Sequence, residues 1–202
     1  MNKISRILLH PFSGFEDMKY NNDSSPLLAS LAVLMFFIAS VAERQYTAFR
    51  FNYYDVSSTN IIYIFISSVV LVLFFVLANW SITTLVDGKG TLPQIFAVMG
   101  YSLIPYISAL LLTTVLSHIF IADEGMFLSI IKTAGILYTV LLIFAGMMEI
   151  HRLSAPKTVF CLIISVVGVF LIMFLCFLLY TLFQQILSFF GSVIDEIMLR
   201  MN

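Results

Sequence analysis

Few residues of this chain have the type and spacing that chemistry requires. The histidines His10, His118 and His151 are far apart, and no H-x-x-x-H, C-x-x-C, G-x-S-x-G or paired intramembrane aspartate pattern accompanies them. Cys161 and Cys176 are fifteen positions apart in one apolar segment, about 22 Å along a helix at ~1.5 Å per residue, which is too far for a disulfide. We expect ordinary buried thiols, with an intermolecular or reactive role as the alternative, and we expect no enzymatic activity, no cofactor and no metal site.

Lys132 is the charged residue that lies inside an otherwise apolar segment. A charge at that depth is costly and is by default a functional hypothesis. Lys132 lies about six residues, or roughly 9 Å, from the outer end of its segment. Its side chain is therefore expected to reach the membrane interface or to pair with Glu124, eight positions earlier. The alternative is a role in binding a transported ion or substrate.

A glycine-containing turn, Asp-Gly-Lys-Gly-Thr, occupies residues 87–91 and places Asp87, Gly88 and Gly90 before a predicted helix. Backbone N–H groups and the helix dipole favour an anion at such a position. The G-x-x-x-x-G-K-[ST] spacing is absent, however, and no strand precedes the turn. We interpret the segment as a plain turn, with a contact to a lipid headgroup or a partner protein as the alternative.

Gly100, Tyr101 and Pro105 form a further cluster near the middle of a long apolar segment. The proline disturbs helical geometry against the carbonyl of Tyr101, which predicts a kink or break. Glycine allows a neighbouring helix to approach closely. Irregular backbone at this depth must be buried in protein or line a cavity, so we favour a packed kink, with a gate or a binding site as the alternative.

The composition determines the elements that position these residues. Hydrophobic residues make up 61% of the 202 residues and charged residues 10%, whereas a soluble domain carries about 25% charged residues. The mean hydropathy is +1.05. Because a bilayer core needs about 20 apolar helical residues per crossing, we predict an all-α polytopic membrane protein with one domain over residues 1–202. The predicted spans are about 26–42, 61–86, 92–122, 126–149 and 158–182.

Short interfacial helices are predicted at both ends. Residues 3–9 have one apolar face until Pro11 interrupts, and Ser13-x-x-Glu16 matches a capping box that opens a second short helix. This N-terminal part is expected to anchor to the membrane surface, with partner docking as the alternative. Residues 184–202 alternate apolar and polar side chains and are also expected to be amphipathic. The start of the chain lacks the apolar core of a cleaved signal, so we expect the mature N-terminus as written.

The basic residues predict an orientation. With a cytoplasmic N-terminus, six lie inside and three outside, so the sequence predicts an N-in, C-out topology. The inner ones are Lys3, Arg6, Lys19, Lys89, Arg152 and Lys157, and the outer ones are Arg44, Arg50 and Arg200. The formal charge of −1 argues against a nucleic-acid partner, which would require a basic face.

Several short elements together resemble the YIP family of membrane proteins, which is named for interaction with Ypt/Rab-type GTPases. The resemblance is nearest to the bacterial branch and extends over nearly the whole chain. It implies a five-helix domain with a cytoplasmic N-terminus and no enzymatic role, since eukaryotic relatives act in ER–Golgi vesicle traffic through protein partners. The sequence lacks their longer cytosolic N-terminal region with its D-L-Y-G-P-type element, so it is a poor candidate for GTPase binding. The elements are Asn79-Trp80, the turn 87–91, Gly100-Tyr101-x-x-x-Pro105, His151, Lys157-Thr158 and the ending from Gln184-Gln185 to Glu196 and Arg200.

These patterns favour a non-catalytic integral protein of the bacterial plasma membrane. Its expected partners are the lipid bilayer and other integral membrane proteins, or a second copy of itself. Such a protein acts as a scaffold, for example in membrane trafficking or transporter assembly. The alternative is a small-solute or ion transporter or channel component, in which Pro105 and Lys132 face a common hydrated cavity near the kink.

Overall fold

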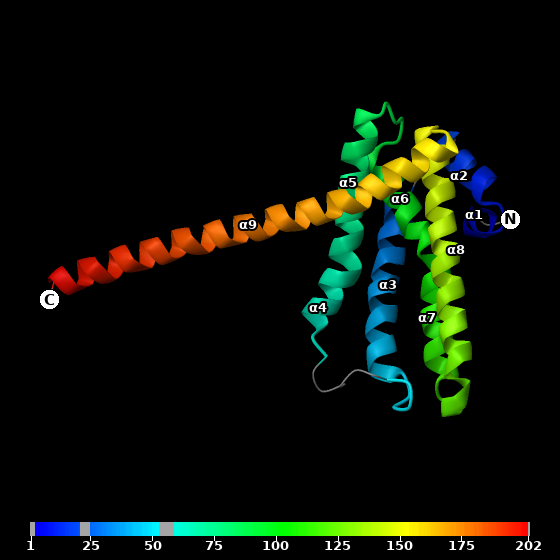
Figure 1. The fold of residues 1–202 in the computed structure, drawn as a ribbon, viewed down its shortest axis with the longest axis horizontal. Coiled ribbons are helices and arrows are strands. Elements are labelled where there is room, and N and C mark those ends of the chain that lie inside the picture. Colours follow the sequence, from blue (N-terminus) through cyan, green and yellow to red (C-terminus); the bar gives the residue numbers. More distant parts are fainter. Residues whose placement is uncertain (1–2, 21–24, 53–58, 202) are drawn as a thin grey trace.

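A computed structural model describes residues 3–20, 25–52 and 59–201 (Figure 1). Every regular element of these residues is a helix, which confirms the predicted all-α class. In chain order the elements are α1 (Lys3–Leu9), α2 (Pro11–Tyr20), α3 (Pro26–Tyr46), α4 (Ile61–Phe65), a π-helical turn (Ile66–Val70), α5 (Leu71–Leu85), α6 (Leu92–Ser102), α7 (Ile104–Leu116), a 3-10 turn (Ala122–Glu124), α8 (Gly125–His151) and α9 (Ala155–Met201).

Within the described residues, five helical stretches are long and apolar enough to cross a membrane. They are α3, α4 through α5, α6 through α7, α8 and α9, and they correspond to the five predicted spans. The first four alternate in direction, so the chain passes back and forth between two faces (Figure 1). We call the face with α1, α2 and the connections 86–91 and 152–154 the N-terminal face. The distal face carries residues 47–52 and 117–124.

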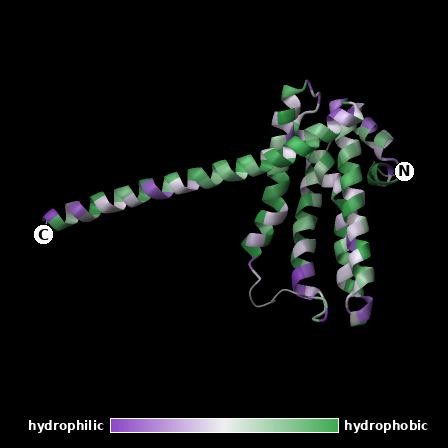
Figure 2. Cartoon of the chain, in the orientation of Figure 1, coloured by the Kyte–Doolittle hydropathy of each residue, from purple (hydrophilic) through white to green (hydrophobic). Residues whose placement is uncertain are grey.

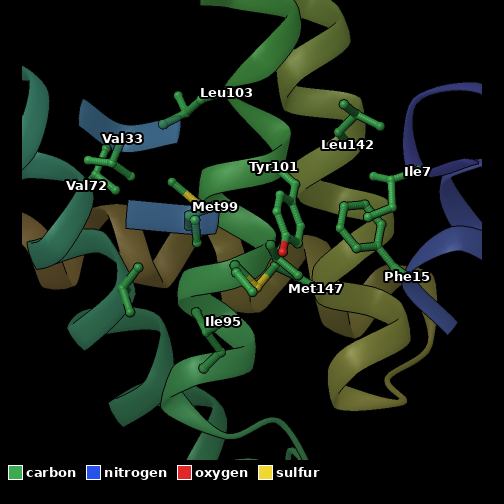
Figure 3. Close-up of a cluster of buried hydrophobic side chains, with 14 of the residues drawn as sticks. Ile7, Phe15, Val33, Val72, Ile95, Met99, Tyr101, Leu103, Leu142 and Met147 are labelled. Atoms are coloured by element: carbon green, nitrogen blue, oxygen red, sulfur yellow. The ribbon is translucent and has the colours of Figure 1, made fainter. Parts of the chain in front are cut away.

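The helix α6 lies at the centre of the bundle, packed against α3, α5 and α8. Its side chains are buried almost continuously from Ile95 to Ser102. Figure 3 shows Tyr101 of this helix among buried side chains from α1, α2, α3, α5 and α8. A helix buried on nearly all sides must be apolar around most of its circumference, as α6 is.

The N-terminal helices pack against the bundle, a contact that the predicted surface anchor did not include. Ile7, Phe15 and Met18 are each no more than 1% exposed and belong to the main core cluster, while α2 packs against α8. The capping box at Ser13 does not open the second helix, because α2 already begins at Pro11. Proline is well tolerated in a first helical turn, where its missing N–H needs no partner.

One other helix end differs from its predicted position, and one predicted break is present. The helix α3 does not stop at Ala42 but continues through Glu43 and Arg44, because both charges have partners: Glu43 pairs with Lys132 and Arg44 lies over the ring of Tyr63. The predicted break near Pro105 is present, since α6 ends at Ser102 and α7 begins at Ile104.

The helix α9 leaves the bundle and runs across the other helices (Figure 1). Its first part packs against α5 and α8. Residues 184–202 were expected to form a separate amphipathic helix, but α9 continues without interruption through them to Met201. We call residues 173–200 the distal half of α9. Figure 2 shows that α9 is apolar along most of its length, and the large apolar side chains of this distal half are exposed.

Candidate functional site

The Gly100-Tyr101-Pro105 cluster lies in the protein interior. A Cβ atom on Gly100 would come within 2.7 Å of the Cα atom of Ala29, so α3 and α6 are in backbone contact there. The Tyr101 side chain is 1% exposed, and its hydroxyl donates a hydrogen bond of 3.3 Å to the carbonyl of Ser25. The glycine and the tyrosine thus join α6 to the start of α3.

The break beside Pro105 is packed against α8. A Cβ atom on Gly135 would lie 2.6 Å from the Cβ atom of Ala109 and 3.4 Å from the carbonyl oxygen of Pro105. The Ser108 hydroxyl donates to the same carbonyl at 2.7 Å, a side-chain hydrogen bond to the backbone within the first turn of α7. Small residues on facing helices therefore fill the space beside the kink, as the packed-kink interpretation expects.

The turn at residues 87–91 packs onto His151 at the end of α8. Gly90 N–H donates to His151 Nδ1 at 3.2 Å, and a Cβ atom on Gly88 or Gly90 would lie only 2.8 or 2.6 Å from the imidazole ring. The backbone of Asp87 has φ 58°, a left-handed conformation that closes the turn. The two glycines thus make room for the ring, and the Gly90 N–H that an anion would need is already used.

Further contacts hold α2 at the N-terminal face of the bundle. Lys19 donates to the carbonyl of Ile150, and the guanidinium of Arg152 lies 5.0 Å from the ring centroid of Tyr20. Burial lowers the pKa of the Lys19 side chain, and the positive charges of Arg152 and Lys89 lower it further. The last carbonyls of a helix attract a cation through the helix dipole, so α2 is held at the C-terminal end of α8.

A buried polar contact joins α5 to α9. Asn79 Nδ2 donates to Ser165 Oγ at 3.0 Å, and the Ser165 hydroxyl donates to the carbonyl of Cys161 at 2.7 Å. Both side chains are at most 1% exposed. The sequence singles out Asn79 only as part of the Asn79-Trp80 element, and nothing in it points to Ser165 as the partner.

Lys132 forms an ion pair with Glu43 of α3, not with Glu124. Glu124 instead accepts a hydrogen bond of 3.1 Å from the backbone N–H of Ile121. The side chains of Lys132 and Glu43 are 35% and 26% exposed. Antiparallel spans bring the end of α3 and the start of α8 to the same face, and that topology is the signal from which Glu43 could have been found.

The pair lines a cavity of about 550 Å³ at the distal face. Its walls come from the end of α3, the segment after it, α7 and the start of α8, and include Glu43, Arg44, Arg50, Phe51, Thr113 and Lys132. Pro105 is not among its described lining residues. The structure thus does not bring together the two residues that the transport hypothesis places in one cavity.

The remaining titratable groups do not assemble into a metal site within the described residues. His118 Nε2 lies 2.8 Å from the carbonyl oxygen of Tyr46, which links the end of α7 to the end of α3. Four buried side-chain atoms in described helices have no hydrogen-bond partner there: Asn79 Oδ1, Ser102 Oγ, Thr139 Oγ1 and His151 Nε2.

Five apolar helical stretches of spanning length define a polytopic α-helical membrane protein. Residues 5–178 match the Yip1 domain, so the chain belongs to the Yip1 family. The motifs that carried the resemblance hold the bundle together: Gly100 contacts α3, and the 87–91 turn packs on His151. No curated protein and no solved structure matches the chain.

Proposed function

We propose that this protein is a non-catalytic interaction protein of the bacterial plasma membrane, which assembles with itself or with other integral proteins as a scaffold. The observation that supports the proposal is the distal half of α9. It extends away from the other described helices (Figure 1), and its large apolar side chains are exposed around the helix. A helix that is apolar on every side belongs in lipid or against another protein.

The native cysteines allow a direct test of self-association. Cys176 is exposed on α9, whereas Cys161 is buried. If copies associate along α9, copper-phenanthroline oxidation of membranes will produce a disulfide-linked dimer. The Cys176→Ser variant will abolish this dimer and the Cys161→Ser variant will retain it, because a buried thiol lies outside the reach of a neighbouring molecule.

Purification in mild detergent gives the complementary measurement. A scaffold is expected to elute with its partner or as an oligomer in size-exclusion chromatography with light scattering. A strictly monomeric protein that brings no partner, together with no cross-link at Cys176, would argue strongly against the proposal. The GTPase-binding role known in eukaryotic relatives is not part of it.

The proposal includes an N-in, C-out orientation, which the distribution of Lys and Arg supports. Single cysteines at the two ends of a variant without native cysteines test it with a membrane-impermeant maleimide. In intact cells the reagent is expected to label a cysteine near Arg200 and not one near Lys3. Labelling of both ends from the same side would contradict the topology.

A transporter or channel component is the second candidate, and the Lys132 cavity is the observation that favours it. The kink at Pro105 no longer supports it, because that site is filled by α8. If this candidate is correct, the flux of the transported solute or ion into reconstituted vesicles should fall in the Lys132→Ala variant. Flux that survives Lys132→Ala and Pro105→Ala together would exclude it.

A further inference from the structure

The cavity at the distal face has the size and the chemistry of a binding site. Its volume of about 550 Å³ lies within the range of roughly 300–1,000 Å³ that is typical of small-molecule pockets. Three separate parts of the chain contribute to it, residues 43–52, Thr113 and residues 125–132, so the tertiary fold forms the cavity and no single turn does. It lies apart from the kink and from the turn at residues 87–91.

The described lining carries more positive than negative charge. Its ionisable side chains are Arg44, Arg50 and Lys132, against the single carboxylate of Glu43. The ion pair with Glu43 neutralises Lys132, which leaves the charge of Arg50 in the connecting segment. Within the described parts of the chain Arg50 has no carboxylate partner. A ligand that binds here must therefore be anionic where it meets Arg50.

The geometry of the donors favours a phosphate group over a simple halide. Guanidinium groups present paired N–H donors that match two oxygens of a phosphate. The first turn of α8, with Gly125 and Met126, also lines the cavity, and the positive end of a helix dipole favours an anion in the same place. The dipole of α8 adds to the attraction of the guanidinium groups and does not form a separate binding site.

The walls also contain apolar side chains. Phe51, Met126 and Leu128 line the same cavity as the charged groups. A free phosphate ion is much smaller than 550 Å³, so these side chains leave room for an organic substituent on the phosphate. This mixture of cationic and apolar walls suits a phosphate ester with a short carbon skeleton.

We propose that the distal cavity binds a phosphate ester through Arg50, beside the ion pair of Lys132 and Glu43. Two sources share this chemistry: the headgroup of an anionic phospholipid, and a water-soluble phosphate ester such as glycerol phosphate. The inference goes beyond the scaffold function and does not depend on it, because a binding site of this kind needs no partner protein.

The test uses the full chain, purified in a zwitterionic detergent and stripped of lipid. Native mass spectrometry with added phosphatidylglycerol measures bound lipid, and thermophoresis with glycerol 3-phosphate measures soluble ligand. We expect at least one of the two probes to bind at one site. The Arg50→Gln variant is expected to weaken that binding about tenfold or more, since it removes a paired donor from the phosphate. The matched control Arg200→Gln, at an exposed arginine on α9, should bind as the native chain does.

The outcomes distinguish the two ligand sources and include the results that would overturn the proposal. Retention of the lipid alone assigns the cavity to a headgroup, and binding of glycerol 3-phosphate assigns it to a soluble ester. Failure of both probes to bind overturns the proposal. Equal loss in the Arg50→Gln and Arg200→Gln variants also overturns it, because the binding would then follow net charge alone. Arg50 is exposed in a connecting segment, so its variant is expected to fold even if a Lys132→Gln variant does not.

Discussion

Single side-chain atoms decide whether α3 and α6 can pack as closely as they do. Gly100 faces the backbone of Ala29, whose Cα and carbonyl oxygen would lie 2.7 and 2.8 Å from an added Cβ atom. Backbone atoms of a packed helix cannot rotate away, unlike the end of a flexible side chain. Any residue larger than glycine at this position must therefore push the two helices apart.

The Gly100→Ala substitution is expected to destabilise the protein by about 1–3 kcal/mol through overpacking. Gly191 is the matched control, because it is also helical and an added Cβ atom would meet nothing within 4 Å. Gly191→Ala is expected to leave stability unchanged or slightly raise it, since alanine is the better helix former. Thermal unfolding in detergent measures both variants. An unchanged melting temperature for Gly100→Ala would refute the close contact.

The ion pair between Lys132 and Glu43 makes a second residue-scale prediction. Either Lys132→Ala or Glu43→Gln leaves a partly buried group without its partner, which we expect to cost roughly 1–3 kcal/mol. Exchanging the two charges in a Lys132→Glu, Glu43→Lys double variant should restore part of that loss. Unfolding free energies of the native chain, the single variants and the exchanged pair measure the coupling. Additive losses in the double variant would show that the two side chains do not interact.

For single residues, the sequence predicted which ones are unusual but not what they contact. Lys132 was expected to need a partner, and it has one. Glu124 was the nearest candidate along the helix, yet its carboxylate caps Ile121 N–H. The true partner, Glu43, is eighty-nine positions away, and such a contact depends on how antiparallel helices align. Periodicity within one helix carries no information about that alignment.

Among the elements, α2 gives the clearest prediction. Phe15 is fully buried beside Gly146 of α8, whereas Phe12 on the same helix is 45% exposed. Phe15→Ala is expected to cost about 3–5 kcal/mol, as for other buried aromatic residues, and Phe12→Ala should cost far less. Thermal unfolding and protease sensitivity of the N-terminal segment measure the difference. Equal effects of the two variants would mean that Phe15 does not pack against α8.

The contact between α5 and α9 gives another prediction at the element scale. Ser165→Ala leaves the Asn79 amide buried without an acceptor, which is expected to cost about 1–3 kcal/mol. A double variant, Asn79→Leu with Ser165→Ala, should recover much of this loss, because no polar group then remains unpaired. Chemical unfolding in detergent compares the three proteins. A double variant with a lower free energy of unfolding than Ser165→Ala alone would show that Asn79 has a different role.

The elements themselves were largely predictable, and their ends were not. Apolar length determined the five spans, and Pro105 determined the break in the third. The end of α3 moved because Glu43 and Arg44 find partners on other helices. The start of α2 moved because Pro11 suits a first turn as well as Ser13 suits a cap. Local signals compete at such ends, and tertiary contacts decide between them.

For the whole molecule, the apolar surface predicts behaviour that a soluble protein would not show. Exposed large hydrophobic side chains cover α3, α5, α8 and most of α9, which is far more apolar area than a soluble monomer exposes. The protein is expected to stay in the membrane fraction after an alkaline carbonate wash and to need detergent for extraction. Release by carbonate, or a dispersed polypeptide in plain buffer, would contradict the membrane assignment.

The direction of α9 could not be predicted, because an all-apolar sequence has no preferred face. The length of α9 nevertheless has a consequence for the bilayer. Residues 158–194 carry no charged side chain and form about 55 Å of straight helix at ~1.5 Å per residue. A hydrocarbon slab of ~30 Å accommodates such a helix only when the helix is strongly tilted away from the membrane normal. So placed, α9 extends roughly 45 Å sideways, and the footprint of one molecule in the membrane plane becomes much wider than its bundle.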